Sequence, residues 1–173
     1  AGLSCGLFDV EQSTREAGDA LLEVEELHVS DDRDIKTVRG VDFTLHKGEV
    51  FGIAGVEGNG QSELIEAITG LRTASDGRVL FDDEDITSMS RRKRIESGIA
   101  YIPEDRQERG IVLDYDLVEN ALLGNQTLRP FADGQLLDWQ AIRDHAEAIV
   151  EKYDVQPPNV DRPSESFSGG NQQ

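Results

Sequence analysis

Three glycines lie between an almost wholly apolar run and a helical pattern, and this arrangement constrains the fold more than any other feature. The apolar run is Glu49–Ala54, and the glycines are Gly55, Gly58 and Gly60. Apolar residues then recur at helical spacing over Gln61–Thr69, which predicts a helix. A short apolar strand, a glycine loop and a helix in this order indicate an α/β fold whose strands are covered on both faces.

Residues 55–62 follow the pattern of a phosphate-binding loop in all but one position. The pattern G-x-x-x-x-G-K-S/T is met at Gly55, Gly60 and Ser62, but Gln61 stands where lysine is expected. Such glycines allow a tight loop whose backbone N–H groups face phosphate oxygens, and the helix N-terminus adds partial positive charge. Ser62 would offer its hydroxyl to Mg²⁺. Taken alone, the loop fits a phosphate site and a glycine-rich turn without ligand equally well.

The missing lysine predicts weaker nucleotide binding. A hydrogen bond from a charged group contributes about 1.5–3 kcal/mol, against about 0.5–1.5 kcal/mol from a neutral group such as the amide of Gln61. We therefore expect affinity to fall about tenfold or more, with poor support for γ-phosphate transfer. Glu57 makes the field inside the loop less favourable to phosphates. A dinucleotide-binding loop fits less well, because G-x-G-x-x-G from Gly58 needs a glycine at Glu63.

The charge of the chain limits its partners. There are 35 acidic and 17 basic residues, a net charge of −18, and the one short basic run is Arg91–Arg94. Nucleic-acid binding needs a basic face, so we expect no nucleic-acid partner. Only 4 of the 17 basic residues are lysines. An acidic excess with few lysines predicts a halophilic protein, because high salt screens repulsion between carboxylates; an ordinary acidic protein is the alternative.

Other classes of protein have little support in the sequence. A single cysteine, Cys5, excludes a disulfide scaffold, and the three histidines lack the spacing of metal ligands. No apolar run approaches the ~18 residues of a membrane span, and the first residues do not resemble a signal peptide. We therefore expect a cytoplasmic protein.

Hydrophobic periodicity and capping signals predict the remaining elements. Residues 1–20 are polar and aperiodic and are expected to be a linker or tail. Further strands are predicted at 21–29, 37–46, 78–81 and 99–102. Helices are predicted at 91–97, after a Ser90 cap, at 117–123 from a capping box at Asp116, and at 139–153 after an Asp138 cap. The order indicates an α/β core with a separate helical subdomain.

The last residues carry the strongest resemblance. Ser168-Gly-Gly-Asn-Gln-Gln173 is similar to the ABC signature LSGGQ, with Phe167 in place of leucine. From about Leu21 to Gln173, the chain resembles the ATP-binding subunits of ABC-type importers for simple sugars and nucleosides. The stretches that carry this resemblance are residues 48–64, 98–106, 116–124 and 166–173.

The resemblance implies a P-loop NTPase core of the ABC ATPase type, with a small antiparallel β part and a helical subdomain. The β and core part would span residues 21–110, the helical subdomain 111–165 and the signature motif 166–173, where the chain ends before any Walker B aspartate. The missing lysine at Gln61 and the run Pro103–Arg106 are similar to the degenerate second domain of tandem subunits.

The family also implies positions for the site residues. ATP and Mg²⁺ would lie against Gly55, Glu57, Gly58, Asn59, Gly60, Gln61, Ser62 and Glu63. Glu104 would take the Q-loop position, so that Ser62 and Glu104 are the candidate metal-site residues. Ser168, Gly169 and Gly170 would cap the γ-phosphate held by the opposite ATPase domain.

Two functions follow from the resemblance. The first is an ATPase domain that powers import of a sugar or nucleoside from the cytoplasmic face of the membrane. The alternative is a non-hydrolysing regulatory domain that completes its partner's ATP site. Either would act with a second ATPase domain, in tandem or as a dimer, with transmembrane permease subunits and, indirectly, with a solute-binding protein. An unrelated phosphate-loop kinase or GTPase is a weaker alternative, since the base-recognition motif N-K-x-D is absent from the chain.

Overall fold

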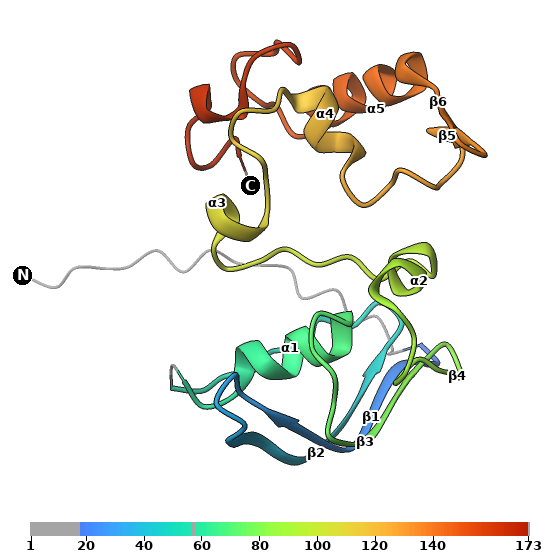
Figure 1. Ribbon diagram of the computed structural model, residues 1–173, viewed down its shortest axis with the longest axis vertical. Coiled ribbons are helices and arrows are strands. Elements are labelled where there is room, and N and C mark those ends of the chain that lie inside the picture. Colours follow the sequence, from blue (N-terminus) through green and yellow to red (C-terminus); the bar gives the residue numbers. More distant parts are fainter. Residues whose placement is uncertain (1–17, 57, 173) are drawn as a thin grey trace, which may run out of the picture. The chain divides into compact units, whose positions relative to one another are not determined.

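The chain is divided into two compact units, residues 1–88 and 89–173. The computed structural model describes residues 18–56 and 58–172, and Figure 1 shows their helices and strands. Most of the predicted linker or tail at 1–20 lies outside the described residues. The division between units falls earlier in the chain than the boundary predicted between residues 110 and 111.

A four-stranded antiparallel sheet forms the first unit, in the order β2-β1-β3-β4. Helix α1, Gln61–Thr69, lies across one face of this sheet (Figure 1). Apolar side chains of β1, β2, β3 and α1 meet between the two layers and are buried, including Leu27, Val29 and Ile68. The strands are β1 (Ala20–Ser30), β2 (Lys36–His46), β3 (Asp76–Phe81) and β4 (Glu84–Asp85).

A bulge keeps the apolar side chains of β1 on one face. The pairing of β1 with β2 shifts register between Val24 and Leu27. Glu26, inside this bulge, has a φ of 45°, and its N–H donates to the carboxylate of Asp42 over 2.7 Å. The extra residue restores the alternation, so that Val24 and Leu27 are both buried against the same core.

The second unit is mainly helical, and two of its three predicted caps form as expected. The side chains of Asp116 and Glu119 form a complete capping box at the start of Leu117–Leu122, and Asp138 accepts hydrogen bonds from two N–H groups of Trp139–Lys152. The predicted Ser90 cap is wrong in one respect: Ser90 is the N-cap residue of Arg91–Glu96, but its side chain makes no capping hydrogen bond. The elements are α2 (Arg91–Glu96), α3 (Arg106–Arg109), α4 (Leu117–Leu122), β5 (Ala132–Asp133), β6 (Leu136–Leu137), α5 (Trp139–Lys152) and the 3₁₀ helix η1 (Ser164–Ser166).

Two predicted strands are wrong. Glu49–Ala54 and Ile99–Ile102 belong to no strand, and in the described part of the chain no strand pairs with either. Their apolar side chains remain open to solvent: Val50 is 98% exposed and Ile102 73%. A buried strand needs neighbours on both edges and layers on both faces, so an apolar run alone does not make one.

We predict that Gly77→Ala destabilises the first unit much more than Gly48→Ala. Both glycines have positive φ, 87° and 80°, so alanine at either position costs about 1–2 kcal/mol of backbone strain. A Cβ at Gly77 would also lie 2.3 Å from the backbone oxygen of Glu26, whereas a Cβ at Gly48 meets nothing within 4 Å. The clash should add about 1–3 kcal/mol. Urea unfolding followed by circular dichroism compares the two variants, and an equal loss of stability would contradict the role assigned to this contact.

Candidate functional site

The glycine loop is held against β2 at its last glycine. Gly60 is the N-cap of α1, with a φ of 97°, and a Cβ there would lie 3.0 Å from the backbone oxygen of Thr37. Earlier in the loop, the N–H of Asn59 donates to the oxygen of Val56 over 3.1 Å, and Gly58 has a φ of 82°. Both glycines are favoured because their backbone is left-handed, and Gly60 also approaches the backbone of β2 closely.

The N-terminus of α1 presents backbone donors that bond to no other residue of the described ranges. The N-cap Gly60 brings no side-chain hydrogen bond to the first turn, and the first helical bond runs from the N–H of Leu64 to the oxygen of Gly60, 2.9 Å. The N–H groups of Gln61, Ser62 and Glu63 precede that bond and are the orphan donors of the helix. Together with the helix dipole, they can bind an anion such as a phosphate group.

Gln61 lies inside the loop, against Gly55. A Cβ added to Gly55 would lie 2.0 Å from Nε2 of Gln61 and 2.8 Å from its Cδ. The carboxamide therefore fills the space beside Gly55 and brings a neutral donor to the loop where the phosphate-loop pattern has a charged one. The hydroxyl-bearing Ser62 is exposed at the start of α1. The predicted loop residue Glu57 lies outside the described residues.

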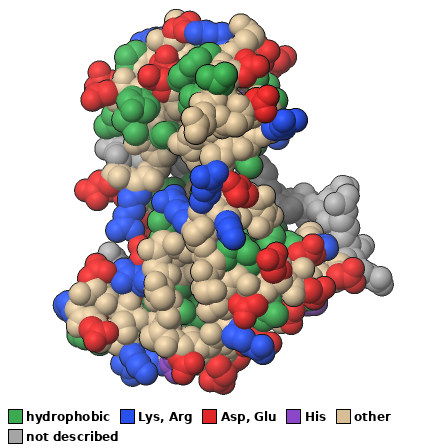
Figure 2. Space-filling view, turned by 45° about the vertical axis from the view of Figure 1, so that its right-hand side comes forward, with side chains coloured by type: hydrophobic (Ala, Val, Ile, Leu, Met, Phe, Trp, Pro, Cys, Tyr) green, Lys and Arg blue, Asp and Glu red, His purple; other side chains and the backbone are tan. Residues whose placement is uncertain are grey.

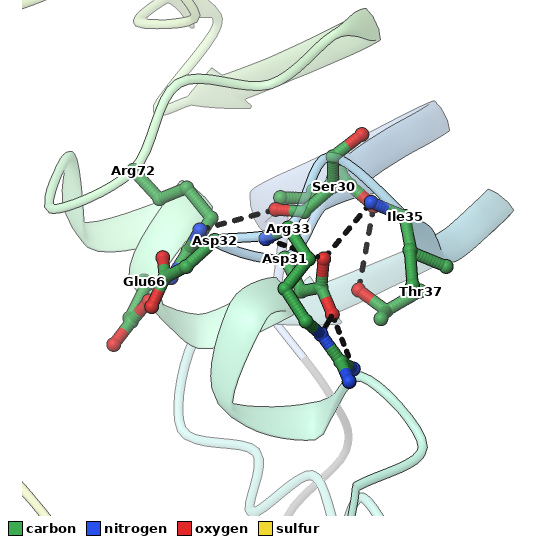
Figure 3. Close-up of polar contacts among 9 residues, drawn as sticks. Ser30, Asp31, Asp32, Arg33, Ile35, Thr37, Glu66 and Arg72 are labelled. Atoms are coloured by element: carbon green, nitrogen blue, oxygen red, sulfur yellow. Dashed lines mark hydrogen bonds and ion pairs between the residues drawn. The ribbon is translucent and has the colours of Figure 1, made fainter.

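An ion pair that the sequence analysis missed connects α1 to the turn after β1. Glu66 is buried on α1, 7% exposed, and its Oε2 accepts from Nε of Arg72 over 2.8 Å. Arg72 also donates to the oxygen of Ser30, 3.1 Å, and pairs with Asp32, 2.8 Å (Figure 3). The hydrogen bond that Arg72 donates to Glu66 is the main cause that raises the pKa of Arg72 above its ordinary value. A glutamate within the apolar run Leu64–Ile68 was the signal that could have revealed this pair.

The predicted Q-loop residue lies in the second unit. Glu104 is exposed and lies two residues before α3. The carboxylate of Asp105, which directly precedes α3, accepts from the N–H of Glu108 over 3.0 Å. Ser62 and Glu104, the two predicted metal-site residues, thus belong to different units, and their association in one metal site stays a prediction.

The signature-like residues Ser168, Gly169 and Gly170 form a turn in the second unit. The N–H of Asn171 donates to the backbone oxygen of Ser168 over 2.9 Å. The side-chain amide of Asn171 donates to the oxygen of Gln156 and to Oγ of Ser168, 2.8 and 3.1 Å. Phe167, in the place of the signature leucine, is buried in the helical core and anchors the turn.

The surface around these elements is mostly acidic. Figure 2 shows many acidic side chains on the visible surface, interspersed with basic ones. The net charge of −18 makes any local group of basic side chains notable, because most of this surface repels anions. Near the glycine loop, Lys36 and Arg39 of β2 and Arg33 of the preceding turn form such a group.

We predict that the effects of Gly55→Ala and Gln61→Ala on stability are coupled. The backbone of Gly55 lies outside the left-handed region, so alanine is opposed there by the Gln61 carboxamide and not by its own conformation. Because the carboxamide is the end of a flexible side chain and can move, Gly55→Ala alone should be only slightly destabilising, and the loss should disappear in the Gln61→Ala background, with a coupling of about 0.5 kcal/mol. Unfolding of the four proteins of the cycle measures this coupling; additive effects would show that the two residues do not touch.

Three comparisons identify the relatives of this chain. The family model for ABC transporters matches residues 38–173. The guanosine import ATP-binding protein NupO of Bacillus subtilis is 39% identical over 96% of this chain and 32% of its own length. The glucose import ATP-binding protein TsgD13 of Haloferax volcanii is 40% identical over 96% of this chain and 31% of its own length. The chain therefore spans about a third of the length of these relatives.

The fold agrees with the sequence match. The crystal structure of a nucleotide-free ATP-binding cassette from an ABC transporter superposes with a TM-score of 0.71 at 25% identity, over 89% of this chain and 61% of the other. The predicted α/β class with its antiparallel β part and helical part is confirmed by this likeness and by the family match over most of the chain. The chain belongs to the ABC transporter family.

Proposed function

We propose that this chain is an ATP-binding domain of an ABC importer ATPase that powers uptake of a simple sugar or a nucleoside. The observation that carries the proposal is the uncapped N-terminus of α1 inside the Gly55–Ser62 loop, which offers backbone N–H groups to a phosphate. Two relatives that match 96% of the chain are named as import ATP-binding proteins for guanosine and glucose, which supports both the cofactor and the class of solute.

In this proposal the Gly55–Ser62 loop forms the weaker of the two ATP sites that a pair of ATPase domains contains. Gln61 supplies a neutral donor, so ATP binding here depends on the backbone, on the helix dipole and on Mg²⁺ held by Ser62. We infer that the chain is the second, degenerate domain of a tandem subunit. Ser168, Gly169 and Gly170 would then donate to the γ-phosphate of ATP bound to the first domain. Glu104 would contribute to the metal site of this domain.

The proposed partners follow from the same assignment. A second ATPase domain completes the ATP sites, permease subunits carry the solute, and an external solute-binding protein delivers it. None of the helices in the described part of the chain is long and apolar enough to span a bilayer. We propose a position on the cytoplasmic face of the membrane, with contact to the permease through the helical unit.

We also propose that the protein works at high salt. The support is the net charge of −18 with only 4 lysines, and the 40% identity to a protein of Haloferax volcanii. In concentrated KCl the Debye length falls to about 3 Å, so the repulsion between surface carboxylates is largely screened. Stability that rises with KCl well beyond physiological ionic strength would support this proposal, and stability independent of KCl would contradict it.

We predict that Gln61→Lys binds Mg-ATP about tenfold more tightly than the wild-type chain, because a charged donor replaces a neutral one. Gln61→Glu, which keeps the size of the side chain and adds a negative charge, should bind more weakly than wild type. Calorimetric titration of the three proteins at low and at multimolar KCl measures both effects. The difference in Mg-ATP affinity between the lysine and glutamate variants should become smaller as the KCl concentration increases.

The outcomes separate the alternatives. Equal affinities in all three proteins would mean that the phosphates do not lie at Gly55–Ser62. No binding by wild type or Gln61→Lys would leave Ser168–Gly170 as the chain's contribution, which is the regulatory alternative. In the complete transporter, ATP hydrolysis that is unaffected by the charge at position 61 would also favour that alternative.

A further inference from the structure

Two backbone hydrogen bonds close the signature-like turn. The N–H groups of Asn171 and Gln172 both donate to the backbone oxygen of Ser168, over 2.9 and 3.1 Å. None of the N–H groups of Ser168, Gly169 and Gly170 donates to another residue of the described ranges. The proposed function assigns these three groups to the γ-phosphate of ATP on the opposite domain, so this contact depends on what holds the turn in place.

The carboxamide of Asn171 pairs with the backbone of Gln156. Its Oδ1 accepts from the N–H of Gln156 over 3.3 Å, and its Nδ2 donates to the oxygen of Gln156 over 2.8 Å. The two ends of an asparagine amide have the same shape, but only one orientation satisfies both of these bonds. The pairing therefore fixes the direction of Nδ2, and it joins the signature-like turn to the loop after α5.

The same nitrogen of Asn171 determines the role of the Ser168 hydroxyl. Nδ2 lies 3.1 Å from Oγ of Ser168 and donates to it. An amide nitrogen is only a donor, so the hydroxyl accepts in this contact and keeps its own proton for another acceptor. Since Ser168 is exposed, this proton can be donated to a ligand together with the N–H groups of the turn.

The donors of the Asn171 side chain are all used within the unit. One hydrogen of Nδ2 binds the oxygen of Gln156 and the other binds Oγ of Ser168. The side chain is half-buried, whereas Ser168 is exposed. The carboxamide therefore has no N–H left for a ligand, and any effect of Asn171 on a ligand passes through Ser168.

We propose that Asn171 is a positioning residue, which fixes the signature-like turn to Gln156 and directs the hydroxyl proton of Ser168 toward the γ-phosphate held by the opposite ATPase domain. The inference rests on the proposed function, which assigns the γ-phosphate to Ser168–Gly170. Donors that are oriented in advance stabilise the charge of a transition state better than donors that must first turn. Asn171 therefore acts on the rate of ATP hydrolysis, and ATP binding depends mainly on the loop of the opposite domain.

A double-mutant cycle between Asn171 and Ser168 in the complete transporter tests this role. Ser168→Ala should lower kcat for ATP hydrolysis about 100-fold, because one donor to the γ-phosphate is lost. Asn171→Ala should lower kcat about tenfold, with the KM for ATP within about twofold of wild type. In the Ser168→Ala background, Asn171→Ala should have no further effect on kcat.

Two more variants separate orientation from folding. Asn171→Asp keeps the shape of the side chain, but its carboxylate accepts the proton of the Ser168 hydroxyl, so its kcat should be at least as low as that of Asn171→Ala. Asn125→Ala is the matched control, since Nδ2 of Asn125 donates to the backbone oxygen of Ala121 over 3.2 Å, outside the signature-like turn. Its kcat should stay within about twofold of wild type. Thermal unfolding identifies a temperature at which all variants are folded, and hydrolysis is compared there.

Other results would overturn the inference. An equal loss of kcat from Asn171→Ala with and without the Ser168 hydroxyl would show that Asn171 does not act through Ser168. A raised KM with unchanged kcat would place Asn171 on the nucleotide, and wild-type kcat and KM would exclude a positioning role. If Ser168→Ala itself hydrolyses ATP at the wild-type rate, the proposed function of Ser168–Gly170 is wrong as well, so the two failures are distinguishable.

Discussion

The close approach of Gly60 to the backbone of Thr37 is the contact on which the rest of the first unit depends. A side chain at position 60 would meet the carbonyl of Thr37 at 3.0 Å, so only glycine lets α1 begin directly on β2. This contact places the free N–H groups of the helix beside the turn between β1 and β2. The junction of Gly60 with Thr37 therefore brings three features together: the orphan donors of the helix, the glycine loop and the group of basic side chains with Arg33.

The ion pair between Arg72 and Glu66 also stabilises the junction of α1 with the sheet. Arg72 joins the buried carboxylate of Glu66 to the turn that carries Arg33. Burying an ionised carboxylate is unfavourable unless it is paired, and Arg72 pairs with the carboxylate of Glu66. The same guanidinium binds the turn after β1. The loop has the neutral Gln61 where the phosphate-loop pattern has lysine. The nearby cations, Arg33, Lys36 and Arg39, belong to β2 and the turn before it and not to the loop.

The phosphate loop and the signature-like turn, the two segments proposed to contact ATP, depend on separate hydrophobic cores. The phosphate loop depends on α1 and the antiparallel sheet, whereas the signature-like turn depends on Phe167 within the helical core. Each half is therefore stabilised by its own unit. Such an arrangement suits a domain whose loop binds one nucleotide and whose signature contacts another, as proposed for paired ATPase domains.

Local chemistry along the sequence determined the helix α1, the caps at Asp116 and Asp138 and the glycine loop, because each depends on bonds within a few residues. Local periodicity also predicted where strands β1, β2 and β3 lie. The tertiary structure decided which apolar runs became strands: Glu49–Ala54 and Ile99–Ile102 did not, since a strand exists only beside another strand. It also decided that Arg72 reaches Ser30, 42 residues away, and that Arg33 lies beside the glycine loop. Such contacts join segments distant in sequence, and no local pattern specifies which of them will meet.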